Sequence, residues 1–405
     1  MKMRIFLLAG EASGDQLGGA LMRSLRLARP DVAFCGVGGS AMADAGLASL
    51  YPLEDLAVMG FLPVLRNLPR LLARMNATVA AVLHESPDAL VIIDSPDFTH
   101  RVASRVRRAM PQLPIVDYVS PTVWAWRSGR ARRMRPYIDH VLGLLPFEPD
   151  AYRRLGGPAC TYVGHPLIER SAELRPSAAD LRRRSETPPL LVVLPGSRRS
   201  EIERLMPIFA ETLQLLAERV GTFEAVLPTL AHLAEDIRAK VASWPVKPRV
   251  ICDPATKFAT FRGAKAALAA SGTVTLELAL AEVPMSVAYA VSWAEALARP
   301  FIKVPSIVLP NLILGENVVP EFLQENCTPE ALAAALAALF VDGPERQRQS
   351  RAFPRIAERL RLPEGETPSA RAVAIVLDTM AHAASLERFS DRMDSPDREE
   401  NAPNQ

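Results

Sequence analysis

Short apolar runs of strand length alternate with amphipathic helical patterns along most of this chain. An apolar strand bounded by amphipathic helices is typical of a parallel sheet that is covered on both faces. The alternation therefore predicts an α/β protein built on doubly wound parallel sheets. The expected strands cover residues 4–9, 33–37, 89–94, 115–119, 140–144, 190–194, 223–227, 249–252, 266–270 and 285–290.

The chain has 405 residues, which is enough for two domains with separate cores. A break is expected near Gly164-His-Pro166, where a polar stretch begins. We predict two Rossmann-like, doubly wound domains that face each other across a cleft, the first at residues 1–165 and the second at 166–350. The segment 386–405 is rich in charge and turn formers, so we expect a disordered tail there.

Charge and cysteine content exclude several classes of protein. A formal net charge of +2 argues against a nucleic-acid binder. The cysteines (Cys35, Cys160, Cys252 and Cys327) lie far apart without a CxxC pair, which fits reduced thiols and gives no zinc site. There is no signal-peptide pattern, and no apolar run approaches the roughly 20 residues that span a bilayer. We expect a cytoplasmic protein, or one that lies on a membrane without crossing it.

Two of the expected strands run into small-residue loops that open a helix, and these loops carry opposite charge. The first loop, 10–15, contains Glu11 and Asp15, and the second, 195–201, contains Arg198 and Arg199. A helix N-terminus favours an anion. The arginines strengthen that field, so the second loop suits a diphosphate. The carboxylates of the first loop would repel a diphosphate and suit a ligand rich in hydroxyls.

The second half of the chain therefore carries the expected nucleotide site, at the carboxyl ends of its strands. Amides and hydroxyls of the Ser271-Gly-Thr273 loop could contact phosphate, and Glu277 could accept a ribose hydroxyl. An ordinary helix cap and a solvated Arg198 are the alternatives. The predicted nucleotide contacts are Gly196, Ser197, Arg198, Ser271, Gly272, Thr273, Glu277 and Asn311.

The first half carries the expected catalytic carboxylate. A buried strand ends at Asp94, whose side chain should point into the cleft and suits a general base. Asp94 and Asp97 could instead cap the following helix, and for Asp97 we favour the cap. One of Glu11 and Asp15 is expected to be structural, because they flank a cap-like Ser13. The catalytic candidates are Asp94, Glu11 and Asp97.

The segment from Met59 to Met75 combines apolar side chains with arginines at a spacing of four. A helix is expected from Leu68, with Pro69 in its first turn. An apolar face edged by arginines is typical of a helix that lies in a membrane plane, although ordinary surface helices share the pattern. An apolar cluster ahead of this helix favours the membrane.

Two tryptophans beside arginines follow the strand at 115–119. They could stack on a sugar or lie at a membrane interface; otherwise Trp124 packs in the core and Trp126 alone is exposed. The residues predicted to contact an acceptor or a membrane are Met59, Phe61, Leu62, Leu65, Arg66, Trp126 and Arg127.

Together these motifs resemble the lipid-A-disaccharide synthase family, inverting glycosyltransferases of the two-domain GT-B fold. The matching segments include 10–15, 56–60, 93–98, 118–127, 144–148, 194–198, 271–273 and 310–312. The Ser-Pro-Thr-Val-Trp-Ala-Trp-Arg run at 120–127 is the most specific of them.

The resemblance implies transfer of 2,3-diacylglucosamine from its UDP derivative to 2,3-diacylglucosamine 1-phosphate, which gives a β-1,6 disaccharide and UDP. It implies work at the inner face of the cytoplasmic membrane, without a metal or another cofactor. It also implies that helices at 351–385 pack back on an N-terminal domain, either their own or that of a partner in a homodimer.

Three other functions are weaker matches to the sequence. A UDP-sugar 2-epimerase shares the fold and the nucleotide site but needs no apolar acceptor patch. A Rossmann dehydrogenase would carry GxGxxG after its first strand, of which the loop at 10–15 is a poor version. A two-lobed solute-binding protein would need a secretion signal.

Overall fold

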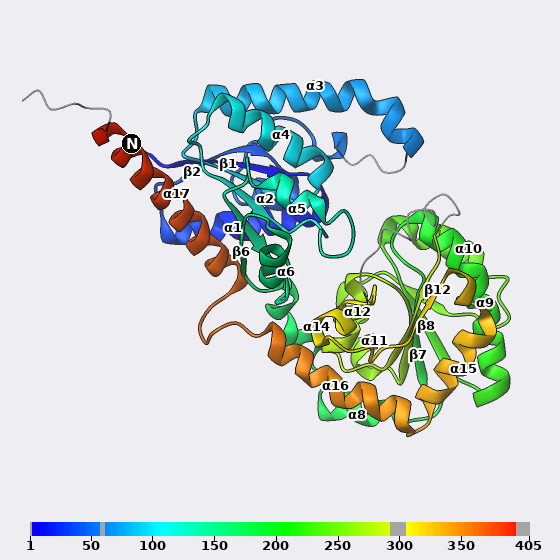
Figure 1. Cartoon of the computed structure of the whole chain (residues 1–405). Helices are drawn as coiled ribbons and strands as arrows, with labels where there is room; N and C mark the ends of the chain where they lie inside the picture. The colour runs from blue at the N-terminus through cyan, green and yellow to red at the C-terminus, as the bar shows by residue number, and fades with distance from the viewer. Residues whose placement is uncertain (1, 57–60, 292–304, 394–405) are drawn as a thin grey trace, which may run out of the picture. The chain divides into compact units, whose positions relative to one another are not determined.

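The computed structural model describes residues 2–56, 61–291 and 305–393. The chain divides into two compact units, one formed by Met1–His165 with Leu362–Gln405 and the other by Pro166–Arg361. Each unit is built on a six-stranded sheet with helices around it (Figure 1). All strand pairs in both sheets are parallel, so the predicted α/β class of two doubly wound sheets is confirmed.

The sheet of the first unit has the order β2-β1-β3-β4-β5-β6. β3 lies in its interior and is buried along its whole length, because helices cover both faces. The strands are β1 (Arg4–Ala9), β2 (Ala33–Val37), β3 (Ala89–Ile93), β4 (Ile115–Tyr118), β5 (His140–Gly143) and β6 (Ala159–Tyr162). The helices are α1 (Ala12–Ala28), α2 (Ser40–Asp44), α3 (Phe61–Glu85), α4 (Pro96–Ala109), α5 (Gly129–Met134), α6 (Glu148–Leu155) and α17 (Pro368–Met393), with a 3-10 turn η1 (Leu53–Asp55).

The sheet of the second unit has the order β12-β11-β10-β7-β8-β9, so β7 and β10 are neighbours. Its strands are β7 (Leu190–Leu194), β8 (Glu224–Pro228), β9 (Arg249–Ile251), β10 (Ala266–Ala270), β11 (Met285–Tyr289) and β12 (Glu321–Leu323). Its helices are α7 (Ser171–Leu174), α8 (Ala178–Arg183), α9 (Arg199–Val220), α10 (Ala234–Val241), α11 (Pro254–Gly263), α12 (Thr273–Leu280), α14 (Leu309–Leu314), α15 (Pro329–Phe340) and α16 (Pro344–Leu360), and its 3-10 turns are η2 (Pro166–Ile168), η3 (Ala231–Leu233) and η5 (Gln324–Asn326).

Each strand predicted from an apolar run is present within one residue of its expected bounds. Sequence analysis missed β6 and β12, which are short and only partly buried. The helix expected from Leu68 begins at Phe61 instead, so Pro69 lies inside α3 rather than in its first turn.

The C-terminal part of the chain differs from its expected division. The second unit extends to Arg361, beyond the expected residue 350, because α16 belongs to it. The chain then returns to the first unit, where α17 packs on α1 (Figure 1). Arg371 Nε of α17 donates to Tyr162 O at 2.9 Å. Ala372, Val373 and Val376 of α17 are buried in the core of that unit. We expected a disordered tail from residue 386, but α17 continues to Met393.

Candidate active site

Asp94 leaves the sheet at the carboxyl end of β3. Its amide still donates to Tyr118 O of the neighbouring strand at 3.1 Å. Asp94 and Ser95 both have left-handed backbone conformations, with φ of 58° and 46°. Such a conformation costs an L-residue roughly 1–2 kcal/mol, and it is concentrated at functional sites. Gly10 lies against this turn, and a Cβ there would be 2.1 Å from the Ser95 Cβ.

Two donors hold the Asp94 carboxylate, which is half-buried. Ser13 Oγ donates to Oδ2 at 2.7 Å, and the Ser95 amide donates to Oδ1 at 2.7 Å. Ser13 is exposed in the first turn of α1. Because a carboxylate has about four acceptor sites, Asp94 is fixed in place and can still accept a proton from a ligand.

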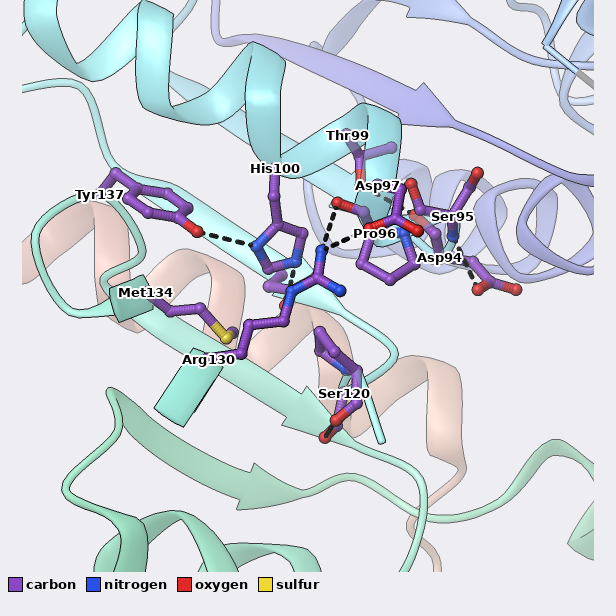
Figure 2. A network of polar contacts seen from close by, with 12 residues as sticks. Asp94, Ser95, Pro96, Asp97, Thr99, His100, Ser120, Arg130, Met134 and Tyr137 are labelled. Atoms are coloured by element: carbon purple, nitrogen blue, oxygen red, sulfur yellow. Dashed lines mark hydrogen bonds and ion pairs between the residues drawn. The ribbon is translucent and has the colours of Figure 1, made fainter. Parts of the chain in front are cut away.

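The cap interpretation of Asp94 and Asp97 is wrong. The N-cap of α4 is Ser95, whose own side chain makes no cap hydrogen bond. Asp97 lies in the first turn of α4 and is exposed, with Oδ1 at 3.3 Å from Arg130 Nη2. Arg130 Nη2 also donates to Pro96 O at 2.8 Å, so Arg130 ties α5 to the start of α4 (Figure 2).

Of the two carboxylates in the first loop, Asp15 is structural. It is buried, and it accepts the amides of Gly39, Ala41 and Met42 at 2.7, 2.9 and 3.0 Å, which hold the start of α2. Glu11 is the N-cap residue of α1, but its side chain makes no cap hydrogen bond. Because Ala9 and Ile93 are partners across β1 and β3, Glu11 and Asp94 emerge from the same edge of the sheet.

The tryptophan loop after β4 has one half-buried and one exposed ring. Trp124 Nε1 donates to Glu148 Oε1 at 3.1 Å, and its ring packs edge-on against Phe147. Trp126 is 39% exposed and donates to Thr122 Oγ1. The Arg127 guanidinium lies 4.2 Å above the Trp126 ring centroid. Trp126 is therefore the exposed tryptophan of this loop, whereas Trp124 is half-buried rather than packed in the core.

Glu148 is a buried carboxyl that sequence analysis did not single out. Its Oε2 accepts the Leu145 amide at 2.9 Å, and the residue is 3% exposed. Burial raises the pKa of Glu148 to about 7, although its hydrogen bonds act in the opposite direction. In the sequence it resembles an ordinary acidic residue in the first turn of a helix, so no local signal identifies it.

The predicted membrane residues are only partly described. Met59 lies outside the described residues. Phe61, Leu62, Leu65 and Arg66 belong to the start of α3, where the structure describes the backbone but not the side chains. Further along α3, Leu68 and Leu72 are 44% and 39% exposed. Arg70 and Arg74 both pair with the buried Asp55, the latter at 2.6 Å.

In the second unit, both predicted phosphate loops line one cavity of about 230 Å³. Gly196 and Ser197 come from the loop between β7 and α9, and Ser271, Gly272 and Thr273 from the loop between β10 and α12. They meet because β7 and β10 are neighbours. Gly196 and Gly272 have φ of 114° and 155°, which favour glycine.

Three of the predicted nucleotide residues lie outside this cavity lining. Arg198 is 61% exposed, and its Nη1 pairs with Glu201 Oε1 at 3.1 Å. Glu277 pairs with Lys257 Nζ at 2.5 Å. Lys257 does line the cavity and was not predicted, because no motif marks it.

Asn311 has a structural role in the second unit. It is buried, and its amide oxygen accepts the amides of Val318 and Val319 at 2.9 and 2.8 Å. Its Nδ2 donates to Val319 O and Ser306 Oγ. These bonds use both ends of the side chain, so we leave Asn311 out of the proposed nucleotide contacts.

Neither unit carries a metal cluster or a membrane span within the part of the chain that the structure describes. No group of three or more His, Cys, Asp or Glu side chains there could hold a metal ion. No helix among the described residues is long and apolar enough to cross a membrane.

Comparison with known proteins relates this chain to one family. A sequence model of the lipid-A-disaccharide synthetase family matches residues 5–374. The lipid-A-disaccharide synthase of Nitrobacter hamburgensis is 57% identical over 383 residues, covering 94% of this chain and 96% of that protein. The lipid-A-disaccharide synthase of Rhodospirillum centenum is 46% identical over 389 residues, covering 95% and 96%.

Solved structures share the architecture at much lower identity. The UDP-GlcNAc 2-epimerase of Neisseria meningitidis has a TM-score of 0.57 and 12% identity, with 94% of this chain and 100% of that chain covered. MurG of Acinetobacter baumannii has a TM-score of 0.54 and 13% identity, with 93% and 99% covered. These are GT-B enzymes, so the predicted GT-B fold is confirmed.

Ionisation of Glu148 should lower the stability of the protein as the pH rises. Its pKa is raised on folding from 4.5 to about 7, so the native state binds the proton more tightly than the unfolded state. Its contribution to stability is then fully present below about pH 4.5 and is lost as the pH rises through 7. Glu148→Gln cannot ionise and should remove this part of the pH dependence, as measured by denaturant unfolding across that range.

The slope with pH is the informative quantity in this experiment. An amide at position 148 cannot accept from both Trp124 and Leu145, so the variant can lose stability at every pH. Glu203→Gln, which changes an exposed residue of α9, is the control and should keep the wild-type slope. A wild-type slope in Glu148→Gln would contradict the raised pKa.

Proposed function

This chain belongs to the lipid-A-disaccharide synthase family and is a glycosyltransferase of lipid A synthesis, and we propose that it joins two acylated glucosamine units with release of UDP. The donor is UDP-2,3-diacylglucosamine and the acceptor is 2,3-diacylglucosamine 1-phosphate. The product is a β-1,6 disaccharide 1-phosphate. The observation that carries this proposal is the strained turn at Asp94, which fixes a carboxylate at the edge of the first sheet.

Asp94 is the general base of the proposed reaction. It takes the proton of the acceptor 6-hydroxyl as that oxygen attacks the anomeric carbon of the donor. Attack comes from the face opposite the UDP group, so the configuration at the anomeric carbon inverts. The bonds from Ser13 and Ser95 fix the carboxylate for this transfer. Glu11, which leaves the neighbouring strand at the same edge, is the second candidate.

The cavity of the second unit receives the diphosphate. Negative charge grows on the leaving phosphate in the transition state, and preorganised donors stabilise it. The amides at the starts of α9 and α12 provide such donors, and Lys257, which pairs with Glu277, lies at the cavity wall. Arg198 is close in sequence and reaches the phosphates once it leaves Glu201.

Replacement of Asp94 should separate catalysis from binding. Asp94→Asn keeps an acceptor oxygen for Ser13 but is a far weaker base, so turnover should fall by about 10²-fold or more. Affinity for the UDP-sugar should stay nearly unchanged, because Asp94 belongs to the other unit. UDP release is measured with and without the lipid acceptor, which also separates transfer from epimerisation. Asp44→Asn, which changes an exposed carboxylate of α2, is the matched control. An active Asp94→Asn would assign the base elsewhere.

Replacement of Arg198 should weaken the nucleotide site. Arg198→Ala removes one charge-assisted contact and should weaken UDP binding by about 1–2 kcal/mol, because the guanidinium gives up Glu201 to make it. Calorimetry with UDP measures the loss of affinity. A separate measurement of wild-type turnover in EDTA tests whether lysine, arginine and backbone amides stabilise the diphosphate without a metal. Arg219→Ala, at the far end of α9, is the control. Unchanged UDP affinity in Arg198→Ala would remove it from the site.

We also propose that α3 and the segment before it bind the inner membrane surface. In the described part of α3, Leu68 and Leu72 are exposed apolar side chains. Combined replacement of Phe61, Leu62 and Leu65 by serine should release the protein from anionic vesicles in a flotation assay, and salt should weaken wild-type binding. A control with Leu27, Leu181 and Leu230, which are exposed on other elements, changed to serine should still bind. Vesicle binding that survives the first triple change contradicts the proposal.

A further inference from the structure

A groove of about 680 Å³ runs along α4 and α5 of the first unit. It begins beside Pro96 and Asp97, just after the turn that holds Asp94. We call it the α4–α5 groove, and its lining is Pro96, Asp97, His100, Arg101, Ser104, Arg105, Arg108, Arg127, Gly129, Arg130, Arg133 and Tyr137. None of the contacts described above accounts for so many arginines in one groove.

The charge of this groove is almost entirely positive. Six of its lining residues are arginines, and Asp97 is its one carboxylate. Asp97 pairs with Arg130. Across residues 2–56, 61–291 and 305–393, the other five arginines have no carboxylate within ion-pair distance. Arg101, Arg105 and Arg108 recur on one face of α4 at spacings where like charges repel. This charge is therefore uncompensated in the protein alone.

The floor of the groove is buried and polar. His100 is 4% exposed, and its Nε2 lies 3.1 Å from Oδ2 of the buried Asp117. Its Nδ1 lies 3.3 Å from the hydroxyl of Tyr137, which follows α5 and lies across the groove from α4 (Figure 2). Burial raises the pKa of Tyr137, so this hydroxyl keeps its proton. Arg130, bonded to Pro96 O and Asp97, fixes the two walls to each other.

The geometry points to the α4–α5 groove as the site that binds the phosphate monoester of the acceptor sugar. Guanidinium groups bind phosphate through paired, charge-assisted hydrogen bonds. The 6-hydroxyl and the anomeric phosphate are carried by the two carbons that flank the ring oxygen, so they lie close together on one side of a glucosamine ring, and the groove likewise begins just after Asp94. An acceptor with its 6-hydroxyl at Asp94 would thus carry its phosphate toward the groove. This inference rests on the proposed transferase function and adds the group by which the acceptor is selected.

The test compares two acceptors that differ only in the phosphate. One is a short-chain diacylglucosamine 1-phosphate, and the other is the matching methyl glycoside, both in detergent micelles without phospholipid. Arg101→Gln with Arg133→Gln should lower kcat/KM for the phosphorylated acceptor by about 10- to 100-fold, the range for charge-assisted hydrogen bonds. The same variant should change kcat/KM for the methyl glycoside by less than about twofold.

The control has the same change of charge elsewhere in the first unit. Arg23→Gln with Arg154→Gln alters exposed arginines of α1 and α6 and should behave as wild type with both acceptors. Thermal melting checks that both double variants remain folded. Equal losses with the two acceptors, or no loss with either, would overturn the inference.

Two further experiments distinguish phosphate binding in the groove from the proposed transfer reaction and from membrane binding. Glucosamine 1-phosphate binding, measured by calorimetry, should be weakened by Arg101→Gln with Arg133→Gln even if no transfer reaction is detected in wild type, so the groove and the proposed reaction can fail independently. Vesicles of phosphatidylglycerol test a lipid headgroup as the ligand. Lost vesicle binding together with unchanged discrimination between the two acceptors would assign the groove to the membrane and overturn the inference.

Discussion

Burial of β3 on both faces is the constraint on which the first unit's site depends. A strand covered by helices on each side cannot carry an ionised group in its interior without a large desolvation cost. The first carboxylate of β3 stands where the chain leaves the sheet, at Asp94, whereas Asp117 inside the neighbouring β4 is buried against His100. The left-handed turn at Asp94 and Ser95 lets α4 start at once, and Gly10 leaves room for that turn. The α4–α5 groove begins beside this turn because its first lining residues, Pro96 and Asp97, are the first residues of α4.

In the second unit, too, the site lies where the chain leaves the carboxyl ends of buried parallel strands. The loops after β7 and β10 are more than 70 residues apart in sequence, yet they line one cavity because their strands pair in register. The two units thus share a construction and differ in charge. Carboxylates leave the first sheet at Glu11 and Asp94, whereas the cavity at the exit from the second is lined by glycine, serine and threonine with one lysine, Lys257, and one carboxylate, Glu201.

Most of the fold was predictable because buried parallel strands are continuous apolar runs. β6 and β12 were missed because they are short, only partly buried and not continuously apolar. The glycine and serine loops of the second unit were predictable from their position after a strand. Side-chain partners were not: Glu148, Lys257 and the function of Asn311 depend on contacts between segments distant in sequence. Asp97 has the sequence signature of a cap, but the turn at Asp94 and Ser95 gives the N-cap to Ser95.

The return of the chain to the first unit has a consequence for synthesis on the ribosome. The second unit is one continuous stretch, whereas the first lacks α17 until the chain is almost finished. Translation at about 5–20 residues per second needs on the order of 10–40 s for the roughly 200 residues between His165 and Leu362. During that time the surface of α1 that later packs against α17 is uncovered. A nascent chain therefore carries an incomplete first unit until α17 has been synthesised, whereas the second unit is already complete.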